Sequence, residues 1–208
     1  MLQNLVSFIV ALDEKFFYFI NSTTANPLFD VLMPFITNTR NFHIPFLLIF
    51  SALVIFGNRY VRIVAVSIVA GVILSDIISS KILKEVFARP RPFEVMMSGI
   101  RQLCGAAGAS MPSSHAVNSF CAATIAALFF NKKISAIPST GNHLLKFIRA
   151  KWVGVVCYFF AFLSAYSRVY VGVHYPTDVI GGALLGMFIG WGVYKGVKKI
   201  FKKMDIPA

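Results

Sequence analysis

The sequence predicts an all-α, polytopic membrane helix bundle with about five transmembrane helices, or six in the alternative, and an N-terminal amphipathic helix at the membrane interface. Hydrophobic residues make up 57% of the 208 residues and charged residues only 13%, about half the share of a soluble domain. Long apolar runs approach the ~20 residues that a spanning helix needs. Alternating strand patterns are absent from the sequence, so we expect one helical domain over residues 1–208, with an interfacial segment over 1–40 and a transmembrane core over 42–199.

The N-terminal stretch, "MLQNLVSFIVALDEKFFYFIN", lacks the basic region and the small-residue cleavage site of a signal peptide. Asp13, Glu14 and Lys15 interrupt its apolar run, which is typical of an amphipathic helix that lies on the membrane. A first transmembrane helix is the alternative interpretation of this stretch.

Five apolar stretches follow, and each is expected to form a transmembrane helix because helices satisfy their own backbone polar groups in lipid. They cover about residues 42–57, 61–83, 114–130, 151–168 and 177–197.

Basic residues are concentrated in the segments after the first, third and fifth of these stretches, and the positive-inside rule places those segments in the cytoplasm. The three segments contribute two, five and five residues, twelve of the twenty in the chain: Arg59, Arg62, Lys132, Lys133, Lys146, Arg149, Lys151, Lys195, Lys198, Lys199, Lys202 and Lys203. The C-terminal run "KGVKKIFKKM" is then expected to face anionic lipids, not nucleic acid.

A first polar cluster, "KEVFARPRP", follows the second apolar stretch. Lys84 and Arg91 are seven residues apart, so they would share a face if the helix persisted, and Pro90 and Pro92 predict that the helix ends here. An ammonium and a guanidinium fork so placed can converge on one anion. The alternative is positive charge that extends from the helix end to the membrane interface.

A second cluster, "MPSSHAV", precedes the third apolar stretch. Ser113 stands at the expected N-cap, and the free N–H groups of a helix N-terminus form an anion site. His115 would lie in the first turn of that helix. Ordinary capping beside an interfacial histidine is the alternative.

A third cluster lies in "SRVYVGVHYPTDVIGG", where the fourth and fifth helices meet. Arg168 ends the fourth helix, while His174 and Asp178 flank Pro176 at the start of the fifth. A carboxylate beside a histidine can hold one ring nitrogen and leave the other free to attack. An interfacial salt-bridge group is the alternative.

The expected topology places these three clusters at the same membrane face. Together they suit the binding of a tetrahedral oxyanion and its transfer to an imidazole. The sequence offers no carboxylate cluster suited to a metal, and its three cysteines lack metal-ligand spacing, so we expect a reaction without a metal or another cofactor.

The three motifs resemble the signatures of the type 2 phosphatidic acid phosphatases, membrane lipid phosphatases related to the vanadium haloperoxidases. The matching elements are K-x6-R-P at Lys84 to Pro92, P-S-S-H at Pro112 to His115, and S-R-x5-H-x3-D at Ser167 to Asp178. The second family motif is more often P-S-G-H, so Ser114 replaces a glycine and adds a hydroxyl near the expected phosphate.

The resemblance implies a role for each matching residue. His174 would be the nucleophile that forms a phosphohistidine, Asp178 would orient it, and His115 would protonate the leaving oxygen. The phosphoryl oxygens would be held by Lys84, Arg91, Arg168, Ser113 and Ser114.

Three further features of the sequence lie outside the three motifs. Asp76, inside the second apolar stretch, lies too deep for phosphate chemistry and is expected to make a structural hydrogen bond. Gly182, Gly186 and Gly190 predict close helix packing within the bundle, with homodimerisation as the alternative. Arg89 flanks the site and is interpreted as ordinary solvated charge, with contact to a substrate headgroup as the alternative.

We therefore expect metal-independent hydrolysis of a membrane lipid phosphate or pyrophosphate, at the outer face of a bacterial inner membrane and with the C-terminus in the cytoplasm. Candidate substrates are undecaprenyl pyrophosphate, which we favour, phosphatidylglycerol phosphate and the 1-phosphate of lipid A. The alternatives are a lipid-to-acceptor phosphotransferase and a non-catalytic lipid or anion transporter. The oligomeric state stays open.

Overall fold

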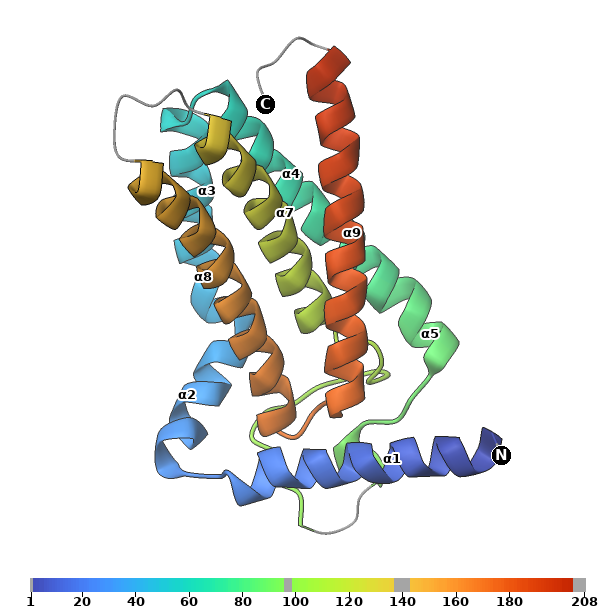
Figure 1. The fold of residues 1–208 in the computed structure, drawn as a ribbon. Coiled ribbons are helices and arrows are strands. Elements are labelled where there is room, and N and C mark those ends of the chain that lie inside the picture. Colours follow the sequence, from blue (N-terminus) through green and yellow to red (C-terminus); the bar gives the residue numbers. More distant parts are fainter. Residues whose placement is uncertain (1, 96–98, 137–142, 204–208) are drawn as a thin grey trace.

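The computed structural model describes residues 2–95, 99–136 and 143–203, and this part of the chain is helical without strands. The five predicted membrane stretches are all helices (Figure 1). They form α3 (His43–Phe56), α4 (Arg59–Ile77) with its π-helical continuation η3 (Ile78–Leu83) and α5 (Lys84–Phe87), α7 (Ser114–Ala136), α8 (His143–Tyr170) and α9 (Pro176–Lys203). The predicted all-α membrane bundle is thereby confirmed.

Four stretches of the described chain are long and apolar enough to cross a membrane. They are Thr39–Phe56, Arg59–Val95, Trp152–Tyr170 and Pro176–Ile200. The apolar part of α7, Ser114–Phe130, is shorter, but α7 lies in the centre of the bundle and contacts α4, α8 and α9 (Figure 1). The fourth predicted helix is longer than expected, because α8 already begins at His143.

The core of the bundle lies where α4 and α9 pack against α7. Val64, Val117 and Ile125 are buried there. The backbone of α9 approaches α7 closely at its glycines, since a Cβ added to Gly186 would lie 2.3 Å from the carbonyl oxygen of Val117. The predicted packing role of the glycines of α9 within the bundle is thus confirmed.

The N-terminal segment contains two helices, where the sequence predicted one amphipathic helix. They are α1 (Leu2–Tyr18), which continues into the π-helical turn η1 (Phe19–Thr23), and α2 (Pro27–Thr37). Asn26 caps α2, because its side chain accepts a hydrogen bond from the N–H of Phe29, and Pro27 at the first position sharpens the start. Figure 1 shows α1 crossing the end of the bundle, while α2 packs on α8.

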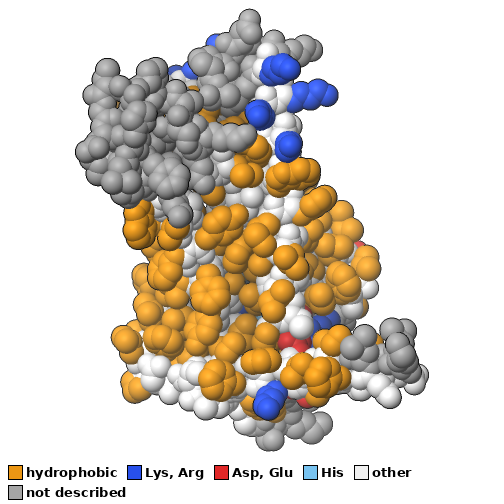
Figure 2. Space-filling view, in the orientation of Figure 1, with side chains coloured by type: hydrophobic (Ala, Val, Ile, Leu, Met, Phe, Trp, Pro, Cys, Tyr) orange, Lys and Arg blue, Asp and Glu red, His pale blue; other side chains and the backbone are white. Residues whose placement is uncertain are grey.

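Charge and hydrophobic surface are separated along the bundle. Hydrophobic side chains cover its middle, and basic side chains gather at the C-terminal end of α9 (Figure 2). The exposed side chains of Lys195, Lys198, Lys199 and Lys202 belong to this basic end, which lies opposite α1 and α5 (Figure 1). The side chains of Lys132, Lys133, Lys146, Arg149, Lys151 and Lys203 lie outside the described part of the chain.

Candidate active site

Three segments meet at the end of the bundle that α1 crosses. The chain leaving α5, the chain entering α7 and the turn between α8 and α9 come together there (Figure 1). Nη1 of Arg91 lies 3.3 Å from Nε2 of His174, and the N–H of Ser113 donates to the carbonyl oxygen of Asp178 at 3.1 Å. The structure therefore brings the three sequence clusters into one site.

His174 and Asp178 form a buried pair at the start of α9. Nδ1 of His174 lies 3.4 Å from Oδ2 of Asp178, and the two residues are 2% and 0% exposed. The same carboxylate oxygen accepts the N–H of Tyr175 at 2.9 Å, which fixes its position. With Nδ1 facing the carboxylate, the second ring nitrogen of His174 points toward the chain that leaves α5.

Burial also sets the protonation state of His174. Loss of hydration is the main reason that its pKa is lowered from 6.5 to about 4. The Asp178 carboxylate opposes this shift, whereas the charges of Arg168 and Arg91 add to it. At neutral pH the ring is neutral, so Nε2 carries a lone pair when Nδ1 donates its hydrogen to Asp178.

Arg91 is almost completely buried, and its fork donates mainly to backbone carbonyls. Nε donates to the carbonyl of Gly108 at 2.8 Å, Nη2 to that of Ala107 at 2.8 Å, and Nη1 to that of Val173 at 2.9 Å. The sequence predicted that Arg91 holds phosphoryl oxygens. In the structure it joins the 107–109 loop to the His174 turn, with Nη1 beside the histidine nitrogen.

Two buried polar atoms in this site have no hydrogen-bond partner among the described residues: Oγ of Ser113 and Nε of Arg168. Ser113 stands at the predicted N-cap of α7, but its hydroxyl does not cap the helix. Nη1 of Arg168 donates to Oγ1 of Thr37 at 2.6 Å, and its carbonyl accepts the N–H of Val173 at 3.2 Å. Both unpaired donors therefore belong to residues that contact the His174 turn.

Lys84 completes the cationic side of the site. Its half-buried ammonium interacts electrostatically with Arg91, Arg168 and Asp178. The described residues supply it with no hydrogen bond or ion pair within contact distance. Lys84 and Arg168 thus both keep donor capacity that the protein does not use.

His115 and Ser114 are turned toward neighbouring helices. Nε2 of His115 lies 3.2 Å from the carbonyl oxygen of Thr37, so this nitrogen carries a hydrogen. The Ser114 hydroxyl lies 2.9 Å from that of Ser80 in η3. The expectation that this hydroxyl points at a phosphate finds no support in the contact it makes.

Asp76 is held by side chains of the same region, as the sequence predicted. Asn118 donates to Oδ1 of Asp76 at 3.1 Å, and the Ser80 hydroxyl donates to the same oxygen at 3.3 Å. These contacts make Asp76 part of a polar network between α4 and α7.

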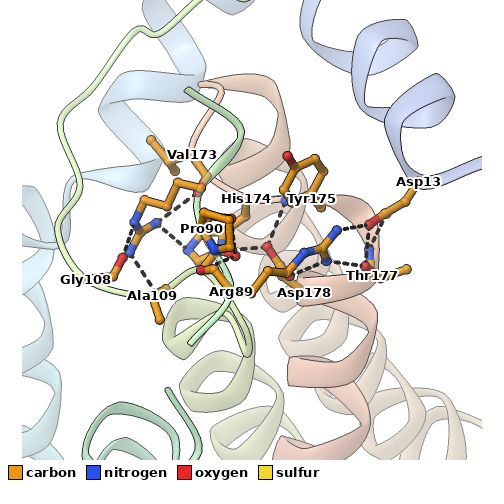
Figure 3. Close-up of polar contacts among 12 residues, drawn as sticks. Asp13, Arg89, Pro90, Gly108, Ala109, Val173, His174, Tyr175, Thr177 and Asp178 are labelled. Atoms are coloured by element: carbon orange, nitrogen blue, oxygen red, sulfur yellow. Dashed lines mark hydrogen bonds and ion pairs between the residues drawn. The ribbon is translucent and has the colours of Figure 1, made fainter. Parts of the chain in front are cut away.

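Sequence reasoning missed three residues that support the site: Asp13, Thr37 and Arg89. Arg89, interpreted as solvated charge, instead forms ion pairs of 2.7 Å with both Asp13 and Asp178. Figure 3 shows His174 and Asp178 between Gly108 and Ala109 on one side and Asp13 and Thr177 on the other. One signal was available, since Asp13 interrupts the apolar run of α1.

Within the described residues, no three or more histidine, cysteine, aspartate or glutamate side chains converge in an arrangement that could hold a metal ion. The donors around His174 are instead guanidinium, ammonium and hydroxyl groups, which suit an anionic oxygen ligand.

The helical membrane bundle and this cationic histidine site define an integral membrane phosphatase. Residues 60–202 match the family model described as the PAP2 superfamily, and the chain belongs to this superfamily. The predicted resemblance to the type 2 phosphatidic acid phosphatases is thereby confirmed, and with it the enzyme class of lipid phosphatases.

Three proteins illustrate the relationship. The undecaprenyl-diphosphatase BcrC of Bacillus subtilis is 31% identical over 170 residues, which cover 80% of this chain and 74% of that protein. The crystal structure of a transmembrane PAP2-type phosphatidylglycerolphosphate phosphatase from Bacillus subtilis has a TM-score of 0.66 at 27% identity and covers 92% of this chain and 87% of that one. The crystal structure of Aquifex aeolicus LpxE has a TM-score of 0.62 at 26% identity, with coverage of 88% and 95%.

Proposed function

We propose that the enzyme hydrolyses undecaprenyl pyrophosphate through a phosphohistidine on His174, without a metal, at the outer face of the bacterial cytoplasmic membrane. One observation carries the proposal. The neutral His174, held by the Asp178 carboxylate, lies close to the charges of Arg91 and Arg168, and the buried Ser113 Oγ and Arg168 Nε have no partner among the described residues. A bound phosphoryl group would satisfy both donors.

In the first step, Nε2 of His174 attacks the terminal phosphorus of the substrate. The new P–N bond forms as the bridging P–O bond breaks, and the lipid monophosphate leaves. The hydrogen on Nδ1 stays directed at Asp178, which stabilises the positive charge that develops on the ring. His115 is assigned to protonate the leaving oxygen. Its Nε2 hydrogen stays on the carbonyl of Thr37, so the neutral ring takes up one proton at Nδ1 when the anionic substrate binds and passes that proton to the leaving oxygen.

In the second step, a water molecule attacks the phosphohistidine. The P–N bond breaks, inorganic phosphate is released, and His174 returns to its neutral form. His115, left neutral by the first step, takes a proton from the attacking water, so the acid of one step is the base of the next. That proton leaves with the inorganic phosphate, so no net proton or electron remains on the enzyme after one cycle.

The phosphoryl oxygens are assigned to Lys84, Arg168, Ser113 and the N–H groups of the first turn of α7. A developing negative charge is stabilised strongly by donors that are already in place and excluded from water. Arg91 keeps Nη1 beside Nε2 of His174, so it can exchange this contact for an oxygen of the attached phosphoryl group. Ser114 is assigned a position in the first turn only, since its hydroxyl bonds Ser80.

The substrate assignment is supported by a relative that is 31% identical over 170 residues and is named as an undecaprenyl-diphosphatase. The assigned orientation is supported by charge. Exposed lysines gather at the end of α9 opposite the site, and basic residues favour the cytoplasmic side. On this orientation, the same lysines face the anionic lipids of the cytoplasmic leaflet.

The test is phosphate release by purified enzyme in detergent with EDTA present, across undecaprenyl pyrophosphate, phosphatidylglycerol phosphate and lipid A 1-phosphate. We expect the pyrophosphate to give the highest kcat/KM, and an acid-labile phosphoenzyme to accumulate in rapid-quench samples. His174→Ala should abolish both signals, whereas His43→Ala, an exposed histidine outside the site, should leave them unchanged. Undiminished release by His174→Ala would refute the nucleophile, and inhibition of the wild type by EDTA would refute metal independence.

A further inference from the structure

One buried carboxylate in the site comes from helix α1, outside the part of the chain that matches the family model. Most described side chains of α1 are exposed, and many of them are large and hydrophobic. Two of its described residues are buried: Asp13, at 3% exposed, and Phe17, which lies one turn later on the same face and is 0% exposed. Because a buried charge is unfavourable unless it is paired, the contacts of Asp13 indicate what it does.

Asp13 caps helix α9 from outside. A helix N-terminus leaves N–H groups unsatisfied, and Tyr175, which precedes α9, has no side-chain oxygen placed to accept them. Oδ1 of Asp13 accepts the N–H of Thr177 at 2.9 Å, and Oδ2 accepts the Thr177 hydroxyl at 2.5 Å. Asp178 accepts the N–H of Tyr175, so two carboxylates from different helices complete this helix start.

Arg89 connects the two carboxylates. Its Nη2 donates to Asp13 at 2.7 Å, and its Nη1 donates to Oδ1 of Asp178 at 2.7 Å, while its guanidinium lies 4.0 Å from the centre of the Tyr175 ring. Ala88, in the left-handed conformation with φ of 41°, ends α5 directly before Arg89. The result is a continuous series of contacts from Asp13 through Arg89 and Asp178 to His174 (Figure 3).

We propose that Asp13 is a positioning residue through which helix α1 holds the Asp178–His174 pair in its reactive geometry. Phe17 supports this docking, since its ring lies 5.7 Å from that of Tyr175. The exposed apolar side chains of α1 keep the helix at the lipid surface, so the membrane itself favours the docked arrangement. The inference rests on the proposed role of His174 as nucleophile.

The decisive variant is Asp13→Asn, which keeps the size of the side chain and removes its charge. Arg89 then retains Asp178 as its one carboxylate partner, and the cap on Thr177 is weakened. We expect kcat to fall roughly 10- to 100-fold, as it does when catalytic groups shift by about 1 Å, with KM within about threefold of wild type. Glu14→Gln is the matched control, since it removes the same charge from the neighbouring residue of α1.

Three readouts separate positioning from a purely structural role. Asp13→Glu restores the charge and should recover kcat to within about fivefold of wild type. Asp13→Asn combined with Arg89→Gln should be no slower than Arg89→Gln alone, because both changes act through Asp178. The single-turnover rate of phosphoenzyme formation, normalised to folded enzyme, should fall with kcat even when Asp13→Asn lowers the yield of protein.

The result that would overturn the inference is a wild-type single-turnover rate for the folded Asp13→Asn enzyme, or multiplicative effects of Asp13→Asn and Arg89→Gln. Either outcome would leave the proposed function intact if His174→Ala is inactive in the same assay. Activity in His174→Ala would instead refute the proposed function itself, whatever Asp13→Asn shows.

Discussion

Replacing Arg91 by lysine tests whether this arginine organises the site or only attracts phosphate. The substitution keeps one positive charge and removes the fork geometry. If Arg91 acts as a point charge, Arg91→Lys should bind substrate nearly as well as wild type. If its main role is to join two loops, the variant should lose stability and positioning.

The contacts of Arg91 give the expected magnitude. Three donors of one rigid guanidinium reach the carbonyls of Ala107, Gly108 and Val173, which lie in two separate segments. An ammonium on a flexible stem cannot occupy all three donor positions, so at least one buried carbonyl loses its partner. Each such loss costs about 1–3 kcal/mol, and we expect a total of about 3 kcal/mol.

The assay is equilibrium unfolding in mixed detergent micelles, followed by circular dichroism, together with kcat and KM on the best substrate. Arg91→Lys should unfold more easily and should lose about 100-fold in kcat, because the Val173 carbonyl and His174 Nε2 lose a shared donor. Arg101→Lys is the matched control, since its partly exposed pair with Asp30 is screened by water and should contribute little to stability. Wild-type stability of Arg91→Lys, with only KM raised, would refute the structural role.

Three further predictions follow from the geometry. The pKa of His174 is about 4 in the folded enzyme and about 6.5 in the unfolded chain, so the unfolded chain binds the proton first as the pH falls. The free energy of unfolding should therefore be highest above pH 6.5 and should fall by roughly 3 kcal/mol toward pH 4. The acid limb of kcat/KM should also lie near pH 4, and an acid limb near pH 6.5 would contradict this prediction. Gly186→Ala should destabilise the enzyme by about 1–3 kcal/mol in thermal unfolding, because its Cβ would meet the Val117 backbone, whereas Gly192→Ala, with open space around it, should not. Thr37→Val removes the hydroxyl that accepts a hydrogen bond from Arg168 and should lower kcat/KM about tenfold. An unchanged kcat/KM would contradict the prediction that Thr37 positions Arg168.

The helices could be predicted because their signal is local. Apolar length set the stretch over 42–57 to within one residue of α3 at each end, and the spaced glycines of α9 indicated its packing on α7. The motif spacing likewise indicated that Lys84, His115 and His174 belong to one site. In each case the property that was predicted depends on residues close together along the chain or on the order of whole helices.

The supporting contacts could not be predicted because they depend on backbone positions in loops. Nothing near Arg91 in the sequence indicates that the carbonyls of Ala107 and Gly108 lie within reach of its fork. The same holds for Thr37, whose hydroxyl and carbonyl meet Arg168 and His115 only because α2 packs on α8. Contacts between residues this far apart in the sequence depend on tertiary packing, and local sequence propensity carries no information about them.

The cations of the site form two groups: those that are paired with a carboxylate and those that are not. Arg89 forms ion pairs with Asp13 and Asp178, so its charge is balanced within the protein. In the described part of the chain, no carboxylate lies within ion-pair distance of Lys84, Arg91 or Arg168. Keeping these charges together without counter-charges is unfavourable, so on the proposed function a phosphoryl group that comes within reach of His174 would relieve their repulsion. The repulsion among these cations would then contribute to the affinity for the group that reacts.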